Sequence, residues 1–233
     1  MPGVLITPEG GEIQDENGEV VGDGPEWLLL LSSHYDVYTE DPLLMHWVGL
    51  VKNIGPDIVC PVGFNPTFYD DQGVEVRSFF GGLVYAPLYV RSGDNVPRTC
   101  VGPGEFAMAA ALDHSNQPPV DVARVIEVGY SASGVAYSDL SPKEWVALSA
   151  AMLDDHVVSG TVVNGDDELR SWNLYIFGTV QSEVGKVPLG FQYASKGELS
   201  STISPGDVDT FDGDPPFHAP VTGFEVYYTV RLP

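Results

Sequence analysis

Short runs of alternating apolar and polar residues recur along this 233-residue chain, and Gly, Pro, Asn or Asp bounds most of them. Near the C-terminus, for example, Val226, Tyr228 and Val230 occupy alternate positions in "GFEVYYTVRL". Such alternation turns one side of a strand toward a core and the other toward water. Because 26 Gly and 19 Pro residues supply many turns and no helical crossover separates the runs, the sequence predicts an all-β protein of antiparallel β-sandwiches.

One segment also fits a helix. In "SPKEWVALSAAML", Ser141 is a candidate N-cap, Pro142 suits the first helical position and Glu144 completes a capping box. Its counterpart "GPEWLLLLSSHYDV" is less helical, because it continues into His, Tyr and Val. We therefore predict a strand in both segments.

The chain contains an internal repeat. "VGPGEF" (101–106) and "ISPGDV" (203–208) each place a Pro-Gly-acid turn before a strand-like run, and "WVGLVKN" (47–53) resembles "VSGTVVN" (158–164). The matching segments occur in the same order in both copies. The offset between equivalent residues falls from 118 at Glu26 and Glu144 to 98 at Tyr130 and Tyr228. We infer a duplication whose second copy has shorter loops, with the two turns at the same inter-strand corner.

Each copy has a usual domain size of about a hundred residues. We predict one sandwich over residues 25–135 and a second over 141–233, with the small polar residues near 131–141 between them. Residues 1–24 form either a flexible tether or a small hairpin, because "IQDENGEVV" contains an Asn-Gly turn signal.

The charge balance excludes some partners. Ten Lys and Arg residues face 33 Asp and Glu residues, a formal net charge of −23. This field repels nucleic acids and anionic lipid surfaces, and no run of about 18 apolar residues is present for membrane insertion. The first twenty residues lack a signal-peptide pattern, so the protein is either cytoplasmic or extracytoplasmic with its leader absent from this sequence.

Two cysteines, Cys60 and Cys100, are too few for a disulfide scaffold and lack the spacing of a zinc site. They form either one disulfide or two free thiols.

Three short motifs of copy one follow one another as "GLVKN" (49–53), "FYDDQG" (68–73) and "PGE" (103–105). Copy two keeps "GTVVN" (160–164) and "PGD" (205–207) but lacks Phe-Tyr-Asp. This order resembles the FxLYD-type domain, an immunoglobulin-like module of bacterial extracytoplasmic proteins and lipoproteins. The resemblance implies two tandem immunoglobulin-like sandwiches, an envelope or secreted location and no catalytic residues. Such a location favours a Cys60–Cys100 disulfide.

An acidic loop is the best candidate for a metal site. "DVDTFDGD" places four carboxylates close together, and Ca²⁺ accepts oxygen ligands in flexible geometry. They belong to Asp207, Asp209, Asp212 and Asp214. The spacing is not that of an EF-hand, and the alternative is a solvated acidic loop.

The aromatic residues give one hint of a contact surface. Phe79 and Phe80 are neighbours, and neighbours in a strand point to opposite faces, so we expect one of them to be exposed. Trp27, Trp47 and Trp145 lie at or near matched repeat positions, and we expect them in the core.

No catalytic signature is present: the five histidines are scattered, and neither H-E-x-x-H nor G-x-S-x-G occurs. We expect a non-enzymatic extracytoplasmic protein that acts in binding, in adhesion or as a spacer, with a protein or glycan partner at the cell surface. The alternatives are a calcium-binding surface protein, with Ca²⁺ as its only cofactor, and a hydrolase with an unrecognised site.

Overall fold

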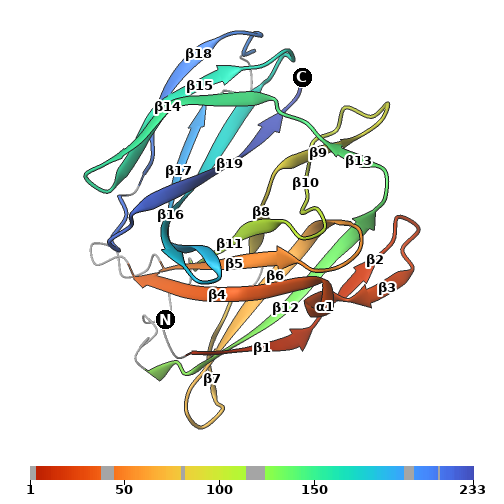
Figure 1. The fold of residues 1–233 in the computed structure, drawn as a ribbon, viewed down its shortest axis with the longest axis vertical. Helices are drawn as coiled ribbons and strands as arrows, with labels where there is room; N and C mark the ends of the chain where they lie inside the picture. Colours follow the sequence, from red (N-terminus) through yellow and green to blue (C-terminus); the bar gives the residue numbers. More distant parts are fainter. Residues whose placement is uncertain (1–3, 38–44, 80–81, 114–123, 197–201, 215) are drawn as a thin grey trace.

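The computed structural model describes residues 4–37, 45–79, 82–113, 124–196, 202–214 and 216–233. Within these ranges nearly every element is a strand and most sheets are antiparallel, which confirms the predicted all-β class. The helix described, α1 (Gly24–Trp27), has four residues. Figure 1 shows two groups of strands stacked along the long axis of the molecule, with β1–β8, β11 and β12 in one group and β14–β19 in the other. We call them the first and the second sandwich.

The first sandwich encloses its core between two sheets. One sheet has the order β4-β5-β11-β8, and the other has the order β3-β2-β12-β6-β7, with β1 paired in parallel to β12. The bounds are β1 (Leu5–Gly10), β2 (Glu12–Gln14), β3 (Val20–Asp23), β4 (Leu28–Val37), β5 (Met45–Asn53), β6 (Ile58–Tyr69), β7 (Glu75–Ser78), β8 (Leu83–Tyr85), β11 (Phe106–Asp113) and β12 (Glu127–Tyr137).

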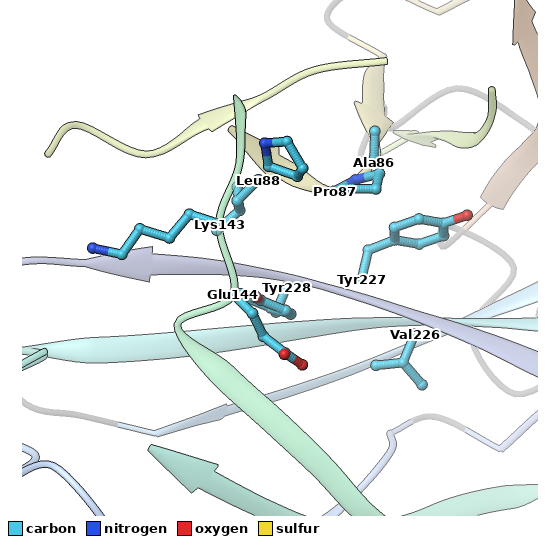
Figure 2. A pocket seen from close by; sticks show the side chains of 9 residues that line it. Ala86, Pro87, Leu88, Lys143, Glu144, Val226, Tyr227 and Tyr228 are labelled. Carbon is cyan, nitrogen blue, oxygen red and sulfur yellow. The ribbon is translucent and has the colours of Figure 1, made fainter. Parts of the chain in front are cut away.

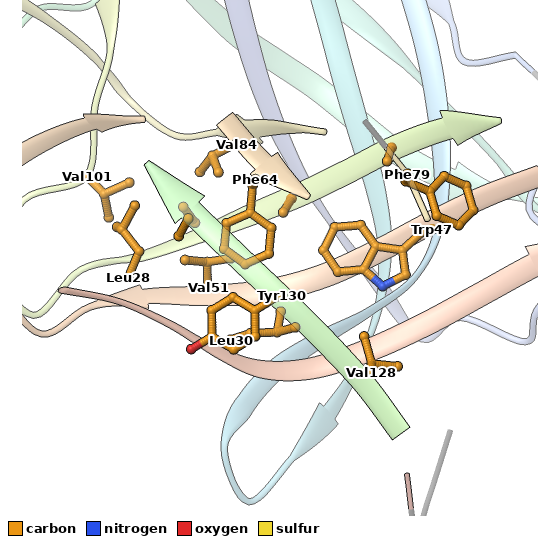
Figure 3. Close-up of a cluster of buried hydrophobic side chains, with 14 of the residues drawn as sticks. Leu28, Leu30, Trp47, Val51, Phe64, Phe79, Val84, Val101, Val128 and Tyr130 are labelled. Carbon is orange, nitrogen blue, oxygen red and sulfur yellow. The ribbon is translucent and has the colours of Figure 1, made fainter. Parts of the chain in front are cut away.

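Aromatic rings fill the centre of this core, as Figure 3 shows. Trp47 stacks on Phe64 with a centroid distance of 5.8 Å, and Phe64 stacks on Tyr130 at 5.3 Å. The Trp47 indole donates a hydrogen bond to the Ser33 hydroxyl at 2.8 Å, so its buried N–H is satisfied. Trp47 and Trp145 are fully buried, and Trp27 packs partly buried against the core.

The second sandwich has three strands in each sheet. One sheet has the order β14-β15-β18 and the other β17-β16-β19. The bounds are β14 (Val146–Asp154), β15 (Val157–Asn164), β16 (Ser171–Ser182), β17 (Gly185–Lys196), β18 (Val208–Asp212) and β19 (Gly223–Arg231). The segment "SPKEWVALSAAML" forms most of β14, and its counterpart "GPEWLLLLSSHYDV" forms β4 after the short helix α1. The prediction of a strand in both segments is therefore confirmed.

The strand registers of the two sandwiches correspond. Leu28 pairs with Asn53 in the first sandwich, and the residues at the repeat offsets, Val146 and Asn164, pair in the second. In the same way, Phe106–Lys52 corresponds to Val208–Val163, and Glu127–Tyr69 corresponds to Glu225–Phe177. The duplication inferred from the sequence therefore extends to the hydrogen-bonded pairing of the strands.

The Pro-Gly-acid turns occupy the same corner in both sandwiches. Gly104 and Gly206 have φ angles of +79° and +81°, a region that favours glycine. The Gly104 amide donates to the Asn53 carbonyl at 2.8 Å, and the Gly206 amide donates to the Asn164 carbonyl at 3.0 Å. The turn therefore connects the end of β5 to the start of β11 in the first sandwich, and the end of β15 to the start of β18 in the second.

An apolar interface joins the two sandwiches. Val48, Leu50 and Met108 from the first sandwich share a buried cluster with Phe177 and Phe191 from the second. A small sheet with the order β10-β9-β13 lies at the connection, with bounds β9 (Leu88–Arg91), β10 (Arg98–Thr99) and β13 (Leu140–Pro142). The two sandwiches are therefore in direct contact through this buried cluster.

The N-terminal residues are part of the first sandwich. β2 and β3 form the small hairpin that the Asn-Gly signal indicated, with Gly18 at φ +84°. β1 and β2 then pair in parallel with one edge of β12, which the sequence did not predict. β12 itself continues to Tyr137, through most of the small polar segment that we expected between the sandwiches.

Candidate functional site

A groove runs beside β19 where the two sandwiches meet. Three segments line its volume of about 390 Å³: residues 86–88, which lead from the end of β8 into the start of β9, residues 142–144, and residues 226–228 of β19. In Figure 2 the first segment lies on one side and Val226 and Tyr228 lie on the other. The lining is Ala86, Pro87, Leu88, Pro142, Lys143, Glu144, Val226, Tyr227 and Tyr228. We call this the β19 groove.

Strand alternation positions the three β19 side chains of the groove. Val226 and Tyr228 pack against the core of the second sandwich, and Tyr227 packs against the interface cluster between the sandwiches. The Tyr228 hydroxyl accepts a hydrogen bond from the Trp145 amide at 3.0 Å. Burial raises the pKa of both tyrosines, so the groove contains neutral phenols at neutral pH.

Two charged side chains lie at the rim of the groove. The Lys143 amine is 2.8 Å from an Asp167 carboxylate oxygen and 4.9 Å from the centre of the Trp145 ring. Glu144 is exposed. The floor is therefore apolar and aromatic, whereas the rim carries one charge of each sign.

One edge of β19 has no strand beside it in the described part of the chain. β16 pairs with its other edge from Arg231 to Gly223, and β19 ends the sheet. Edge strands present unpaired backbone N–H and C=O groups, which can pair with another extended segment. The groove follows this open edge at residues 226–228.

The four acidic residues proposed for Ca²⁺ do not converge on one point. Asp207 closes its own turn by accepting a hydrogen bond from the Ser204 amide at 2.8 Å, and Asp209 forms an ion pair with Lys196. Asp212 lies opposite Ser159 in the sheet, and the backbone of Asp214 pairs with that of Tyr193 in an isolated antiparallel β-bridge. Among the residues that the structure describes, no group of three or more His, Cys, Asp or Glu side chains could hold a metal ion. The proposed site is corrected accordingly, because strand alternation and the turn send these carboxylates to different places.

Cys60 and Cys100 are joined by a disulfide in the structure. The bond lies in a small apolar cluster with Tyr89 and Leu140, so it connects β6 to the segment beside the β10-β9-β13 sheet. Cys60 also lines a second groove, together with Arg98 and Tyr137.

Of the two residues expected to form a contact surface, Phe79 is not the exposed one. Phe79 is 3% exposed and packs edge-on against Phe68 and Tyr35, so it belongs to the core. Phe80 lies outside the described residues.

Sequence reasoning missed the β19 groove. A signal was available: 27 residues precede β4 in the first copy, whereas only residues 138–145 separate β12 from β14 in the second. The second copy is therefore too short to supply a counterpart of β1 to β3.

No protein-family model matches the chain, and no curated protein is similar to it in sequence. Among the described residues, no helix has the length and apolar character needed to cross a membrane.

Proposed function

We propose that this protein is a non-enzymatic, extracytoplasmic binding module of the cell envelope or of secretions. Two immunoglobulin-like sandwiches of the FxLYD type form a rigid support, and the β19 groove binds a protein partner. The observation that carries this proposal is the combination of an apolar groove with an open strand edge. An open strand edge can form a regular series of backbone hydrogen bonds with another polypeptide. A glycan has no such backbone, so the open edge favours a protein partner.

Two further features support the proposal. The interface between the sandwiches buries Phe177 completely and brings the ring centroids of Tyr85 and Tyr175 to 4.3 Å, which favours a fixed arrangement over a hinge. The Cys60–Cys100 disulfide suits an oxidising compartment. The lining of the β19 groove contains no histidine, serine or free cysteine, so it lacks the side chains of a common hydrolase centre.

Photo-crosslinking in cells tests the binding function. A diazirine amino acid of about the size of glutamate, too small to fill the groove, replaces Glu144 at the rim, and a matched variant carries it in place of the exposed Asp154 at the far end of β14. We expect one protein adduct from position 144 and none from position 154, and we expect the purified adduct partner to bind the purified protein again. Equal labelling from both positions, or no adduct, would contradict the proposal.

The thiol state tests the proposed location. The protein is isolated without reductant, and its intact mass is measured before and after alkylation in denaturant. We expect no mass increase, because Cys60 and Cys100 are bonded. Two alkylated thiols would overturn the extracytoplasmic assignment.

A further inference from the structure

The edge of β12 that corresponds to the open edge of β19 is occupied. β1 pairs with it in parallel, with Ile6 opposite Val128, Thr7 opposite Gly129 and Pro8 opposite Tyr130. The Leu5 amide also donates a hydrogen bond to the Ile126 carbonyl at 2.9 Å. The N-terminal segment therefore completes the first sandwich at this edge.

The β19 groove lies at the equivalent place in the second sandwich. The repeat offset of 98 residues converts residues 128–130 of β12 into residues 226–228 of β19, and the pairing of β12 with β6 and of β19 with β16 agrees with this offset. Residues 226–228 are the part of β19 that lines the groove. The groove is thus the space that β1 fills in the first sandwich.

Side chains along the edge of β19 are less buried than their counterparts along β12, as expected if β19 lacks a neighbouring strand. On β12 the inward-facing Val128 and Tyr130 are 0% and 1% exposed, and Val4 and Ile6 pack against the same core. Their counterparts Val226 and Tyr228 are only partly buried. The second core consequently retains apolar surface that one more strand would remove from water, which is a favourable change.

We propose that the β19 groove accepts an extended segment of a partner protein as a strand parallel to β19, in the register that β1 adopts on β12. The proposal deepens the binding function proposed above and rests on it. The inserted segment places apolar side chains at alternate positions, over Val226 and Tyr228, in the way that Val4 and Ile6 are placed in the first sandwich. The net charge of −23 favours a segment that is not acidic.

The chain itself provides the probe for a first test. A synthetic peptide of residues 4–10, VLITPEG, is extended by two lysines that offset the charge of Glu9, and it carries a fluorophore for anisotropy measurements with the intact protein. We expect saturable binding with a Kd on the order of 10–100 μM, because the interface is small. A peptide with Ile6→Asp should bind at least about tenfold more weakly, because it places a carboxylate against an apolar floor.

Two protein variants locate the binding. Glu144→Trp fills the mouth of the groove from an exposed position, so it should reduce peptide affinity at least about tenfold without affecting folding. The matched variant Asp154→Trp, at the exposed far end of β14, should bind as the unmodified protein does. Hydrogen exchange measured with the peptide bound should slow in residues 223–231 and stay unchanged in residues 127–137.

Three outcomes would overturn the proposal. They are the absence of saturable binding, slowed exchange at β12 in place of β19, and a dimer that forms without peptide and dissociates in Glu144→Trp, since a second copy would then occupy the groove. If the photo-crosslinking adduct forms while the peptide does not bind, the binding function stands and only the strand-addition mode fails.

Discussion

Asn53 and Gly104 are joined by a backbone hydrogen bond of 2.8 Å that closes the corner between β5 and β11. Asn164 and Gly206 form the same bond in the second sandwich at 3.0 Å. In both sandwiches the asparagine side chain is buried, and its amide group donates to carbonyl oxygens of the neighbouring loops. The asparagine and the Pro-Gly-acid turn therefore stabilise the same corner in each sandwich. This structural role accounts for the recurrence of the turn.

Removing either asparagine side chain should destabilise the protein. Asn53→Ala leaves the carbonyls of Asp57 and Val101 without the donor that lies 2.8 Å and 2.7 Å away. We expect each of Asn53→Ala and Asn164→Ala to lower the free energy of unfolding by about 1–3 kcal/mol in urea titrations. The exposed Asn95→Ala serves as the control and should change it by less than about 0.5 kcal/mol. A neutral effect at Asn53 would show that water replaces the lost donor.

Loss of the disulfide should have a larger effect. Cys60 and Cys100 are 40 residues apart, and a cross-link over such a loop stabilises by about 4 kcal/mol on the chain-entropy model. We expect the double variant Cys60→Ala/Cys100→Ala to lose about this amount in denaturant titrations. Reduction of the unmodified protein should give a similar loss. An unchanged midpoint after reduction would mean that the cross-link adds nothing to stability.

The contact between the sandwiches should make them unfold together. Phe177 is fully buried in the interface, 5.4 Å between ring centroids from Tyr85. Phe177→Ala should cost about 3–5 kcal/mol and separate a single calorimetric transition into two. Phe106→Ala, at a side chain that is 44% exposed, should keep one transition. A single transition in both variants would argue that cooperativity does not depend on this interface.

His34 should make stability depend on pH. Burial lowers its pKa to about 4 from an ordinary value of 6.5. Between these values the unfolded chain binds a proton that the folded protein does not, so stability is complete above pH 6.5 and decreases as the pH falls toward 4. His34 pairs with Val48 of the inter-sandwich cluster, so its charge would be desolvated at that contact.

The measurement compares the free energy of unfolding near pH 7 and near pH 5. His34→Gln should show a smaller decrease than the unmodified protein. Equal decreases in both proteins would assign the acid sensitivity to carboxylates instead of to His34.

Local sequence determined the strands, the turns and their repetition. Apolar alternation and the Pro-Gly-acid turns are properties of neighbouring residues, and they predicted the all-β class and the internal repeat. The structure then showed that equivalent residues pair in both copies, Leu28 with Asn53 and Val146 with Asn164. The sequence did not decide which of Phe79 and Phe80 is buried; Phe79 is, because the side of a strand end that meets the core depends on the opposite sheet.

Only the tertiary structure decided which edge of each sandwich is covered. β1 lies more than a hundred residues from β12 in sequence, and its parallel pairing depends on backbone groups that every residue possesses. The side-chain pattern therefore does not specify that β1 pairs with β12. The contact between Phe177 and Tyr85 and the groove beside Val226 likewise arise where the two sandwiches meet, because packing of distant surfaces is set by their combined shape. The sequence thus determined two similar sandwiches, and the tertiary structure covered the edge of β12 and left that of β19 without a neighbouring strand among the described residues.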